Sequence, residues 1–224
     1  MKAIVIGATG ATGNALTQLL LNNEHYQSVM IFVRKPVAIT HPKLTVHLID
    51  FDTPDDWADK IKGDVLFCCL GTSLKQAGNQ QNQRKIDYDY PLVFANIAKQ
   101  NGIARFLVLS SDGANASSRL FYYRLKGELE TALKNIGLNH LTILRPPLLK
   151  RENSDRFGEV VSEKALSFLN QFGLLLSAKP MPTDVLAKAM IQAVADNKTG
   201  ILEKREIWGL GAVYEKNGVK RRAV

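Results

Sequence analysis

The chain has 224 residues, of which 46% are hydrophobic and 22% are charged, and its formal net charge is +8. This composition is typical of a globular protein and excludes an intrinsically disordered chain. No apolar run reaches the roughly 18 residues that a membrane span needs, and the first residues enter a strand pattern rather than a signal peptide. We therefore expect a cytoplasmic protein with one sizeable core and no contact with a membrane.

Charge and the rare residue types limit the partners that the protein can have. The positive excess leaves nucleic acid and a polyanionic small molecule open, but much of it lies in EKNGVKRRAV at the end, which we interpret as a solvated basic tail. Nucleic acid is disfavoured because there is no groove-reading helix or aromatic-interleaved basic patch. Cys68 and Cys69 are neighbours that point to opposite faces of a strand, so no disulfide joins them. The four histidines are scattered, and we expect no metal site.

Short apolar strand segments alternate with helical segments along the chain. We expect strands over 2–7, 28–34, 44–50, 64–71, 105–111 and 140–147, and helices over 14–23, 88–102 and 122–137. Strands rich in Val, Ile and Leu and separated by helices indicate a parallel sheet covered on both faces, which is a doubly wound α/β (Rossmann) fold.

Two local features refine this expectation. Thr53 is placed to cap a short helix, with Pro54 at its first position. After Pro147 the alternation loosens, so we expect residues 1–224 to form a single nucleotide-binding domain in which 148–180 is a small C-terminal segment on the substrate side.

Three glycines, Gly7, Gly10 and Gly13, follow the first strand and open the first helix. In this context the first glycine permits the tight turn, the second lets the backbone approach a pyrophosphate, and the third lets the helix pack close to the strand. Free N–H groups at the helix start attract phosphate, and Thr9 and Thr12 add hydroxyl donors. The sequence therefore predicts a dinucleotide site here.

The end of the second predicted strand indicates which dinucleotide binds. NAD-binding sheets usually carry an acidic residue there for the ribose 2′-hydroxyl, whereas this chain has Arg34 and Lys35. Two cations match a 2′-phosphate, so the pattern favours NADP over NAD. Asp50 at the end of the third strand can contact the adenine amino group, with Phe51 as an apolar wall. Gly71 after the fourth strand permits close backbone approach.

A second constellation follows the fifth predicted strand. Tyr122 and Lys126 are four residues apart on a predicted helix and share a face, while Ser110 and Ser111 lie where the strand ends. A tyrosine, with an ordinary pKa of about 10, is a slow proton donor at neutral pH unless a neighbouring cation lowers that value. Tyr123 lacks a lysine four residues on. The pattern predicts a carbonyl reductase site, in which a serine hydroxyl polarises the substrate oxygen.

These segments resemble the extended or atypical branch of the short-chain dehydrogenase/reductase superfamily, and within it the Tat-interactive protein family of NADP-binding oxidoreductases and its bacterial relatives. The matching motifs are GATGATG, DFDTPDDWA, DVLFCCLGTSLKQAG, KIDYDYPLVFANIAKQNG, FLVLSSDGA, YYRLKGELE and LRPPLL. The short region after residue 150 differs from the larger substrate lobe of the sugar-nucleotide epimerases in this superfamily, which argues against that activity.

The resemblance implies specific residues at each part of the site. The implied catalytic residues are Ser111, Tyr122 and Lys126. The implied contacts of NADP (NADPH) are Gly7, Thr9, Gly10, Ala11, Thr12, Gly13, Arg34, Lys35, Asp50, Phe51, Leu70, Gly71, Thr72 and Lys126.

Two functions remain open at this point. One is an NADPH-dependent oxidoreductase that transfers a hydride to a small carbonyl substrate, with Tyr122 as general acid and base. The other is an NADP(H)-binding, redox-sensing regulatory protein that acts through a protein partner and has little or no turnover. The intact set of serine, tyrosine and lysine favours the enzyme.

Overall fold

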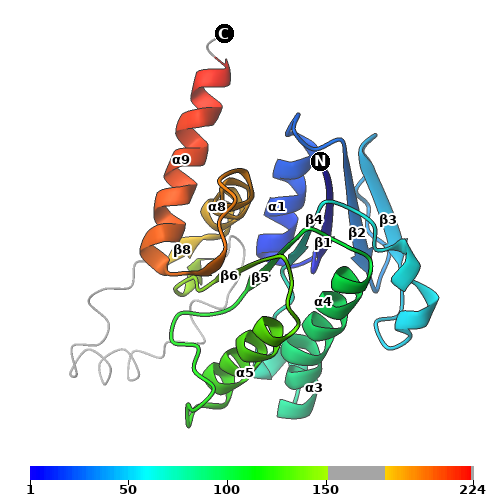
Figure 1. The fold of residues 1–224 in the computed structure, drawn as a ribbon, viewed down its shortest axis with the longest axis vertical. Helices are drawn as coiled ribbons and strands as arrows, with labels where there is room; N and C mark the ends of the chain where they lie inside the picture. Colours follow the sequence, from blue (N-terminus) through cyan, green and yellow to red (C-terminus); the bar gives the residue numbers. More distant parts are fainter. Residues whose placement is uncertain (151–179, 223–224) are drawn as a thin grey trace.

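A parallel β-sheet organises the protein. The computed structural model describes residues 1–150 and 180–222, and it contains a seven-stranded sheet in the order β3-β2-β1-β4-β5-β6-β9 (Figure 1). Every neighbouring pair in this sheet is parallel. The seven strands are β1 (Lys2–Ile6), β2 (Ser28–Val33), β3 (Leu44–Leu48), β4 (Val65–Cys68), β5 (Arg105–Leu109), β6 (His140–Leu144) and β9 (Gly200–Leu202).

Helices cover both faces of this sheet (Figure 1). The helices are α1 (Ala11–Leu21), α2 (Leu74–Ala77), α3 (Gln80–Arg84), α4 (Tyr90–Gln100), α5 (Phe121–Asn135), α8 (Thr183–Ala195) and α9 (Lys204–Arg222). A π-helical turn, Lys85–Asp89, joins α3 to α4. Within the described ranges, no helix combines the length and the apolar character that a membrane crossing requires.

The sheet divides the core into two layers. Val5 and its neighbours on alternate positions pack under α1 and α8, whereas Ile4 and its neighbours pack under α4 and α5. Because the central strands β1, β4 and β5 are buried on both faces, their sequences are largely apolar rather than alternating, whereas the edge strand β3 is mostly exposed. The predicted doubly wound sheet is confirmed, and Cys68 and Cys69 belong to opposite layers as expected.

The order of strands creates the place where a ligand would bind. The chain winds outward from β1 to β3 on one side, and from β4 to β9 on the other. In such sheets the two neighbouring strands at the reversal, here β1 and β4, leave a crevice outside their carboxyl ends. The glycine-rich turn between β1 and α1 lies at that edge.

The C-terminal region is more regular than its sequence indicates. The alternation resumes with α8 and β9, and β9 pairs with β6 at the edge of the sheet. A short two-stranded sheet also forms from β7 (Leu149–Lys150) and β8 (Met181–Pro182). Most of the predicted covering segment, residues 151–179, lies outside the described residues. The basic end of the chain belongs to α9, which continues to Arg222.

The predicted cap at Thr53 is wrong. Pro54 does begin a helical segment, but that segment is a single 3₁₀ turn, Pro54–Asp56, and the Thr53 side chain caps no N–H group. The turn is held instead by the buried indole of Trp57, whose Nε1 donates to the Asp50 carbonyl oxygen at 2.6 Å. The segment after β3 is therefore fixed by an aromatic anchor.

Candidate active site

The glycine-rich turn has the backbone geometry that its sequence predicts. Gly7 has a φ of +80°, and a Cβ built on it would lie 2.8 Å from the carbonyl carbon of Cys69. A Cβ on Gly13 would lie 2.1 Å from the Gly7 carbonyl oxygen. Both positions therefore require glycine, the first for its conformation and the close approach to β4, and the second for tight packing of α1 on the turn.

The start of α1 is suited to an anion. Gly10 occupies the N-cap position, so no side chain accepts from the first-turn N–H groups, and no acidic residue lies in the first turn. Such uncapped N–H groups, together with the helix dipole, favour a phosphate. Thr9 and Ala11 are exposed beside them, whereas Thr12 is buried in the turn.

Two exposed cations follow β2 at the same edge of the sheet. Arg34 and Lys35 form no salt bridge with any residue in the described ranges. The Arg34 guanidinium lies 5.7 Å from the ring centroid of Phe51, which brings it beside the predicted adenine contacts. An uncapped helix start and two unpaired cations one strand away fit the pyrophosphate and the 2′-phosphate of NADP.

Asp50 and Phe51 follow β3 and differ in what they expose. Asp50 is exposed, and its Oδ1 accepts from the backbone N–H of Asp52 at 2.9 Å. The Phe51 ring is buried against Tyr90 and Phe94, with centroid separations of 5.1 and 5.2 Å. Phe51 therefore offers only a small part of its ring to a ligand.

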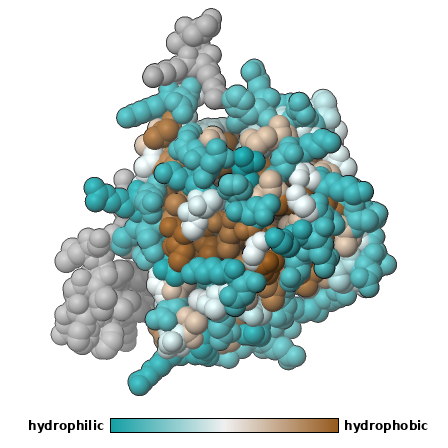
Figure 2. Space-filling view, viewed as in Figure 1, coloured by the Kyte–Doolittle hydropathy of each residue, from teal (hydrophilic) through white to brown (hydrophobic). Residues whose placement is uncertain are grey.

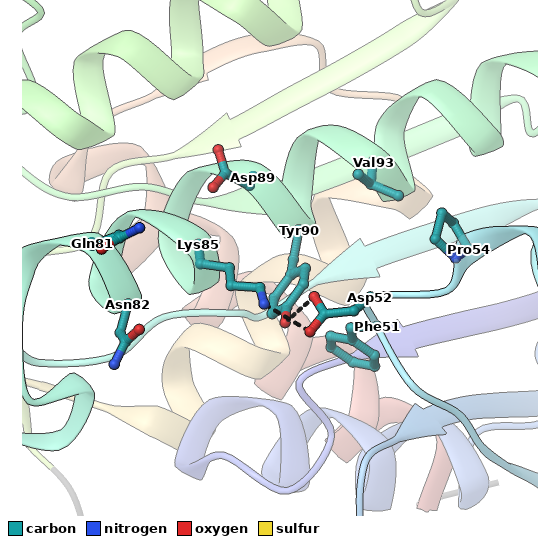
Figure 3. Close-up of a pocket in the computed structure, with 9 residues that line it drawn as sticks. All are labelled: Phe51, Asp52, Pro54, Gln81, Asn82, Lys85, Asp89, Tyr90 and Val93. Carbon is teal, nitrogen blue, oxygen red and sulfur yellow. Dashed lines mark hydrogen bonds and ion pairs between the residues drawn. The ribbon is translucent and has the colours of Figure 1, made fainter.

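A cavity of about 530 Å³ lies beside this segment (Figure 3). It is lined by Phe51, Asp52, Pro54, Gln81, Asn82, Lys85, Asp89, Tyr90 and Val93. In its wall, the Asp52 carboxylate accepts from Lys85 Nζ at 2.7 Å and from the Tyr90 hydroxyl at 2.9 Å. These hydrogen bonds, with the one from Lys85 dominant, hold the pKa of Asp52 below its ordinary value.

Asp87 connects the loop after β4 to the centre of the site. Leu70, Gly71 and Thr72 form that loop, and the Thr72 backbone N–H donates to Asp87 Oδ2 at 2.8 Å. A Cβ on Gly71 would lie 3.5 Å from Asp87 Oδ1 and 3.9 Å from Lys126 Nζ. Asp87 lies in the π-helical turn, a form of helix that is frequent at functional sites.

Lys126 and Asp87 form a buried ion pair. Lys126 Nζ lies 2.9 Å from Asp87 Oδ1, and neither side chain is more than 3% exposed. Lys126 Nζ also donates to the Leu109 carbonyl oxygen at 3.5 Å. Burial acts to lower the pKa of Lys126, but attraction by Asp87, followed by Tyr122, outweighs it and raises the net value above its ordinary range. The lysine is therefore held as an ammonium ion.

The two serines after β5 have different surroundings. The buried Ser110 hydroxyl donates to the Glu130 carboxylate, which also forms a 2.6 Å ion pair with Arg145. Ser111 is half-buried, and its hydroxyl donates only a 3.2 Å hydrogen bond to the Asp112 carbonyl oxygen. Because Ser110 is engaged in the core, Ser111 is the serine available to a substrate.

Tyr122 lies at the open side of this group. Its side chain is 37% exposed, and its ring contacts that of Tyr123 edge to face at a centroid separation of 5.7 Å. In the described part of the chain, no residue hydrogen-bonds to its hydroxyl. Tyr122 lies four residues before Lys126 on α5, so the two side chains share one face of the helix.

The structure thus groups the predicted residues along one edge of the sheet. Those expected to contact phosphate follow β1 and β2, and those expected to carry the chemistry follow β4 and β5. Sequence reasoning missed Asp87 and the cluster of Asp52, Lys85 and Tyr90. Asp87 directly precedes the predicted helix 88–102, and its place between Ile86 and Tyr88 could have drawn attention to it, since buried carboxylates need partners.

Known proteins resemble this chain over most of its length. Residues 7–197 match the family model described as NAD(P)H-binding. Protein HTATIP2 of Rattus norvegicus is 30% identical over 218 residues, covering 94% of this chain and 89% of the rat protein. The mitochondrial protein FMP52 of Eremothecium gossypii is 32% identical over 219 residues, covering 94% of this chain and 97% of its own length. Because this relative is named as mitochondrial, the cytoplasmic location expected from the sequence stays a prediction.

A solved structure supports the fold independently. The oxidoreductase ylbE of Lactococcus lactis superposes with a TM-score of 0.67 over 91% of this chain and 90% of its own, at 18% identity. At that identity the likeness bears on the fold alone. Together with the match over residues 7–197, it shows that the chain is a Rossmann-fold member of the NAD(P)H-binding family, with relatives that include HTATIP2 and FMP52.

Proposed function

We propose that the protein is an NADPH-dependent reductase of the short-chain dehydrogenase/reductase type that acts on a small carbonyl compound. The observation that carries this proposal is the buried ammonium of Lys126, which is held by Asp87 and lies four residues after the exposed Tyr122 on α5. That arrangement lies at the carboxyl edge of the sheet, near β1 and the glycine-rich turn that follows it, which suits a dinucleotide. A cofactor site and a proton donor are thus adjacent.

The residues that would hold the cofactor are those at this edge. The backbone of Gly7–Gly13 suits the pyrophosphate, Arg34 and Lys35 suit the 2′-phosphate, and Asp50 with Phe51 suits the adenine. The loop Leu70–Thr72 lies between them and Lys126. When bound, NADPH supplies the hydride that a carbonyl reduction needs.

Four side chains would carry out the remaining steps of the proposed reduction. The Ser111 hydroxyl donates a hydrogen bond to the substrate oxygen and so favours the negative charge that develops there. The Tyr122 hydroxyl transfers its proton to that oxygen as the carbonyl becomes an alcohol. The ammonium of Lys126 then stabilises the phenolate that remains. Asp87 fixes the ammonium in position through the ion pair.

Replacing Tyr122 tests the proposed chemistry. We expect Tyr122→Phe to abolish NADPH oxidation with a panel of aldehydes and ketones and to leave NADPH affinity nearly unchanged, because only the hydroxyl is lost. Tyr123→Phe is the matched control, since it removes the same group one residue away and should leave the rate intact. A rate that survives in Tyr122→Phe would remove this residue from the mechanism.

The preference for NADP is tested by reversing one charge. We expect Arg34→Glu to weaken NADPH binding by at least about tenfold more than NADH binding, since a charge-assisted hydrogen bond is worth about 1.5–3 kcal/mol. The exposed Lys62, in the segment before β4, provides a control of equal charge change as Lys62→Glu. Equal weakening of both cofactors in Arg34→Glu would show that Arg34 does not contact the phosphate.

An NADP(H)-binding, redox-sensing protein is the second candidate. The observation in its favour is that Asp87 already neutralises the charge by which Lys126 would act on Tyr122. Such a protein would bind NADPH with Arg34-dependent affinity but oxidise it with no member of the carbonyl panel.

A further inference from the structure

Large apolar side chains are exposed around the proposed catalytic tyrosine. Among the residues that the structure describes, seven large hydrophobic side chains are exposed, and four of them follow three neighbouring strands, β4, β5 and β6. Leu74 begins α2 after β4, Leu120 and Tyr122 flank the start of α5 after β5, and Leu148 follows β6.

The topology brings the segments that carry these four side chains to the same edge of the sheet. The three strands are parallel, so the segments that follow them leave the sheet at one edge. Neighbouring strands lie about 4.8 Å apart, so the ends of β4 and β6 are only about 10 Å apart. Figure 2 shows that hydrophobic residues gather near the centre of the viewed face.

Several of the ionic groups near this edge are already paired. Lys126 is paired with Asp87, Arg145 with Glu130, and Lys204 lies 3.7 Å from an Asp112 carboxylate oxygen. Hydrophobic side chains left exposed beside paired charges mark a surface for an apolar ligand. Because Tyr122 is itself one of the four, the apolar surface adjoins the group that would act on a carbonyl.

We infer that the substrate is an apolar carbonyl compound, an aldehyde or ketone whose hydrocarbon part lies against Leu74, Leu120 and Leu148. This inference rests on the proposed function and narrows it from any small carbonyl to a hydrophobic one. Arg119 and Lys150 are exposed basic residues on the same segments, and a carboxylate-bearing substrate would have to bind them instead.

A homologous series of methyl ketones, from butan-2-one to decan-2-one, tests the inference. Each buried methylene should raise kcat/KM about threefold to fourfold until the apolar surface is covered. An ω-carboxylate on a ketone of the same length should lower kcat/KM. A keto acid preferred over the matched ketone, or a flat dependence on chain length, would overturn the inference while leaving the reductase in place.

The variants Leu120→Gln and Leu148→Gln locate the surface. Their side chains are 63% and 55% exposed, so polar replacements should not disturb folding. Leu48→Gln is the matched control, because Leu48 is 60% exposed on β3, the strand at the far edge of the sheet. The increase of kcat/KM with ketone chain length should become weaker in Leu120→Gln and Leu148→Gln and should persist in Leu48→Gln. Equal effects in all three would contradict the inference.

A binding measurement separates this inference from the proposed reaction. Octan-2-ol, which the protein cannot turn over without cofactor, should bind in a saturation-transfer NMR experiment and bind less to Leu120→Gln. If it binds in this way but no carbonyl compound is reduced, the apolar site stands and the proposed reaction fails. If short ketones are reduced but octan-2-ol does not bind, the reaction stands and the apolar site fails.

Discussion

Asp87→Asn offers the strongest test of how the centre of the site is built. The substitution keeps an oxygen that can accept from the Thr72 backbone N–H, but it removes the charge that faces Lys126 at 2.9 Å. Breaking a buried ion pair by removing one partner costs about 3–5 kcal/mol, because the other charge stays buried without compensation. We expect the free energy of unfolding, measured in urea, to fall by about that amount.

The pH dependence of this loss has a definite sign. In the native protein the pKa of Lys126 is raised, so its contribution to stability is complete below the unfolded value of about 10.4 and is lost as pH rises through the folded value. In Asp87→Asn burial acts largely unopposed and lowers that pKa, so stability rises with pH between the folded and unfolded values. The difference in free energy of unfolding between the native protein and Asp87→Asn should therefore decrease between about pH 7 and about pH 9.5.

A second substitution separates the charge from the packing. Lys126→Met in the Asp87→Asn background removes the stranded ammonium and should recover much of the lost stability, since replacing both members of a buried pair by uncharged groups is often nearly neutral. A loss below about 1 kcal/mol in Asp87→Asn, or a deficit that does not change with pH, would refute the ion pair as the organising contact of the site.

Two further predictions concern the turn and the serines. Gly13→Ala should cost more than about 3 kcal/mol of stability, because its Cβ would lie 2.1 Å from a carbonyl oxygen. Gly209→Ala in helix α9, where a Cβ would have nothing within 4 Å, should instead add up to about 1 kcal/mol of stability. Thermal unfolding of both variants checks this contrast, and similar losses of stability would contradict it. Ser111→Ala should lower kcat for the best carbonyl substrate about 100-fold without loss of stability. Ser110→Ala should lower stability by about 1 kcal/mol with little change in kcat, because the Ser110 hydroxyl donates a hydrogen bond to Glu130. The reverse pattern would exchange the roles of the two serines.

Local sequence was sufficient to predict the first half of the fold. The strand β1, the three glycines and α1 have a spacing that only a few structures satisfy, and the backbone contacts of Gly7 and Gly13 bear this out. The central strands β1, β4 and β5 were likewise recognisable, because strands buried on both faces need hydrophobic residues throughout.

Features that depend on contacts between distant segments were not predictable in the same way. Asp87 and Lys126 are far apart in the sequence and meet only because the π-helical turn and α5 pack side by side. The resemblance implied Ser111 as the catalytic serine, but the sequence did not show that the neighbouring Ser110 hydroxyl donates to Glu130 on another element. The strand β9 has three residues, too few for a pattern, and owes its place to pairing with β6.

A crystal structure of the protein grown with NADP⁺ would test the central claim most directly. The account predicts electron density for the pyrophosphate at the first turn of α1, for the 2′-phosphate at Arg34 and Lys35, and for the nicotinamide ring beside the hydroxyl of Tyr122. A nicotinamide ring turned away from Tyr122, or an adenine end that leaves Arg34 and Lys35 in solvent, would contradict it.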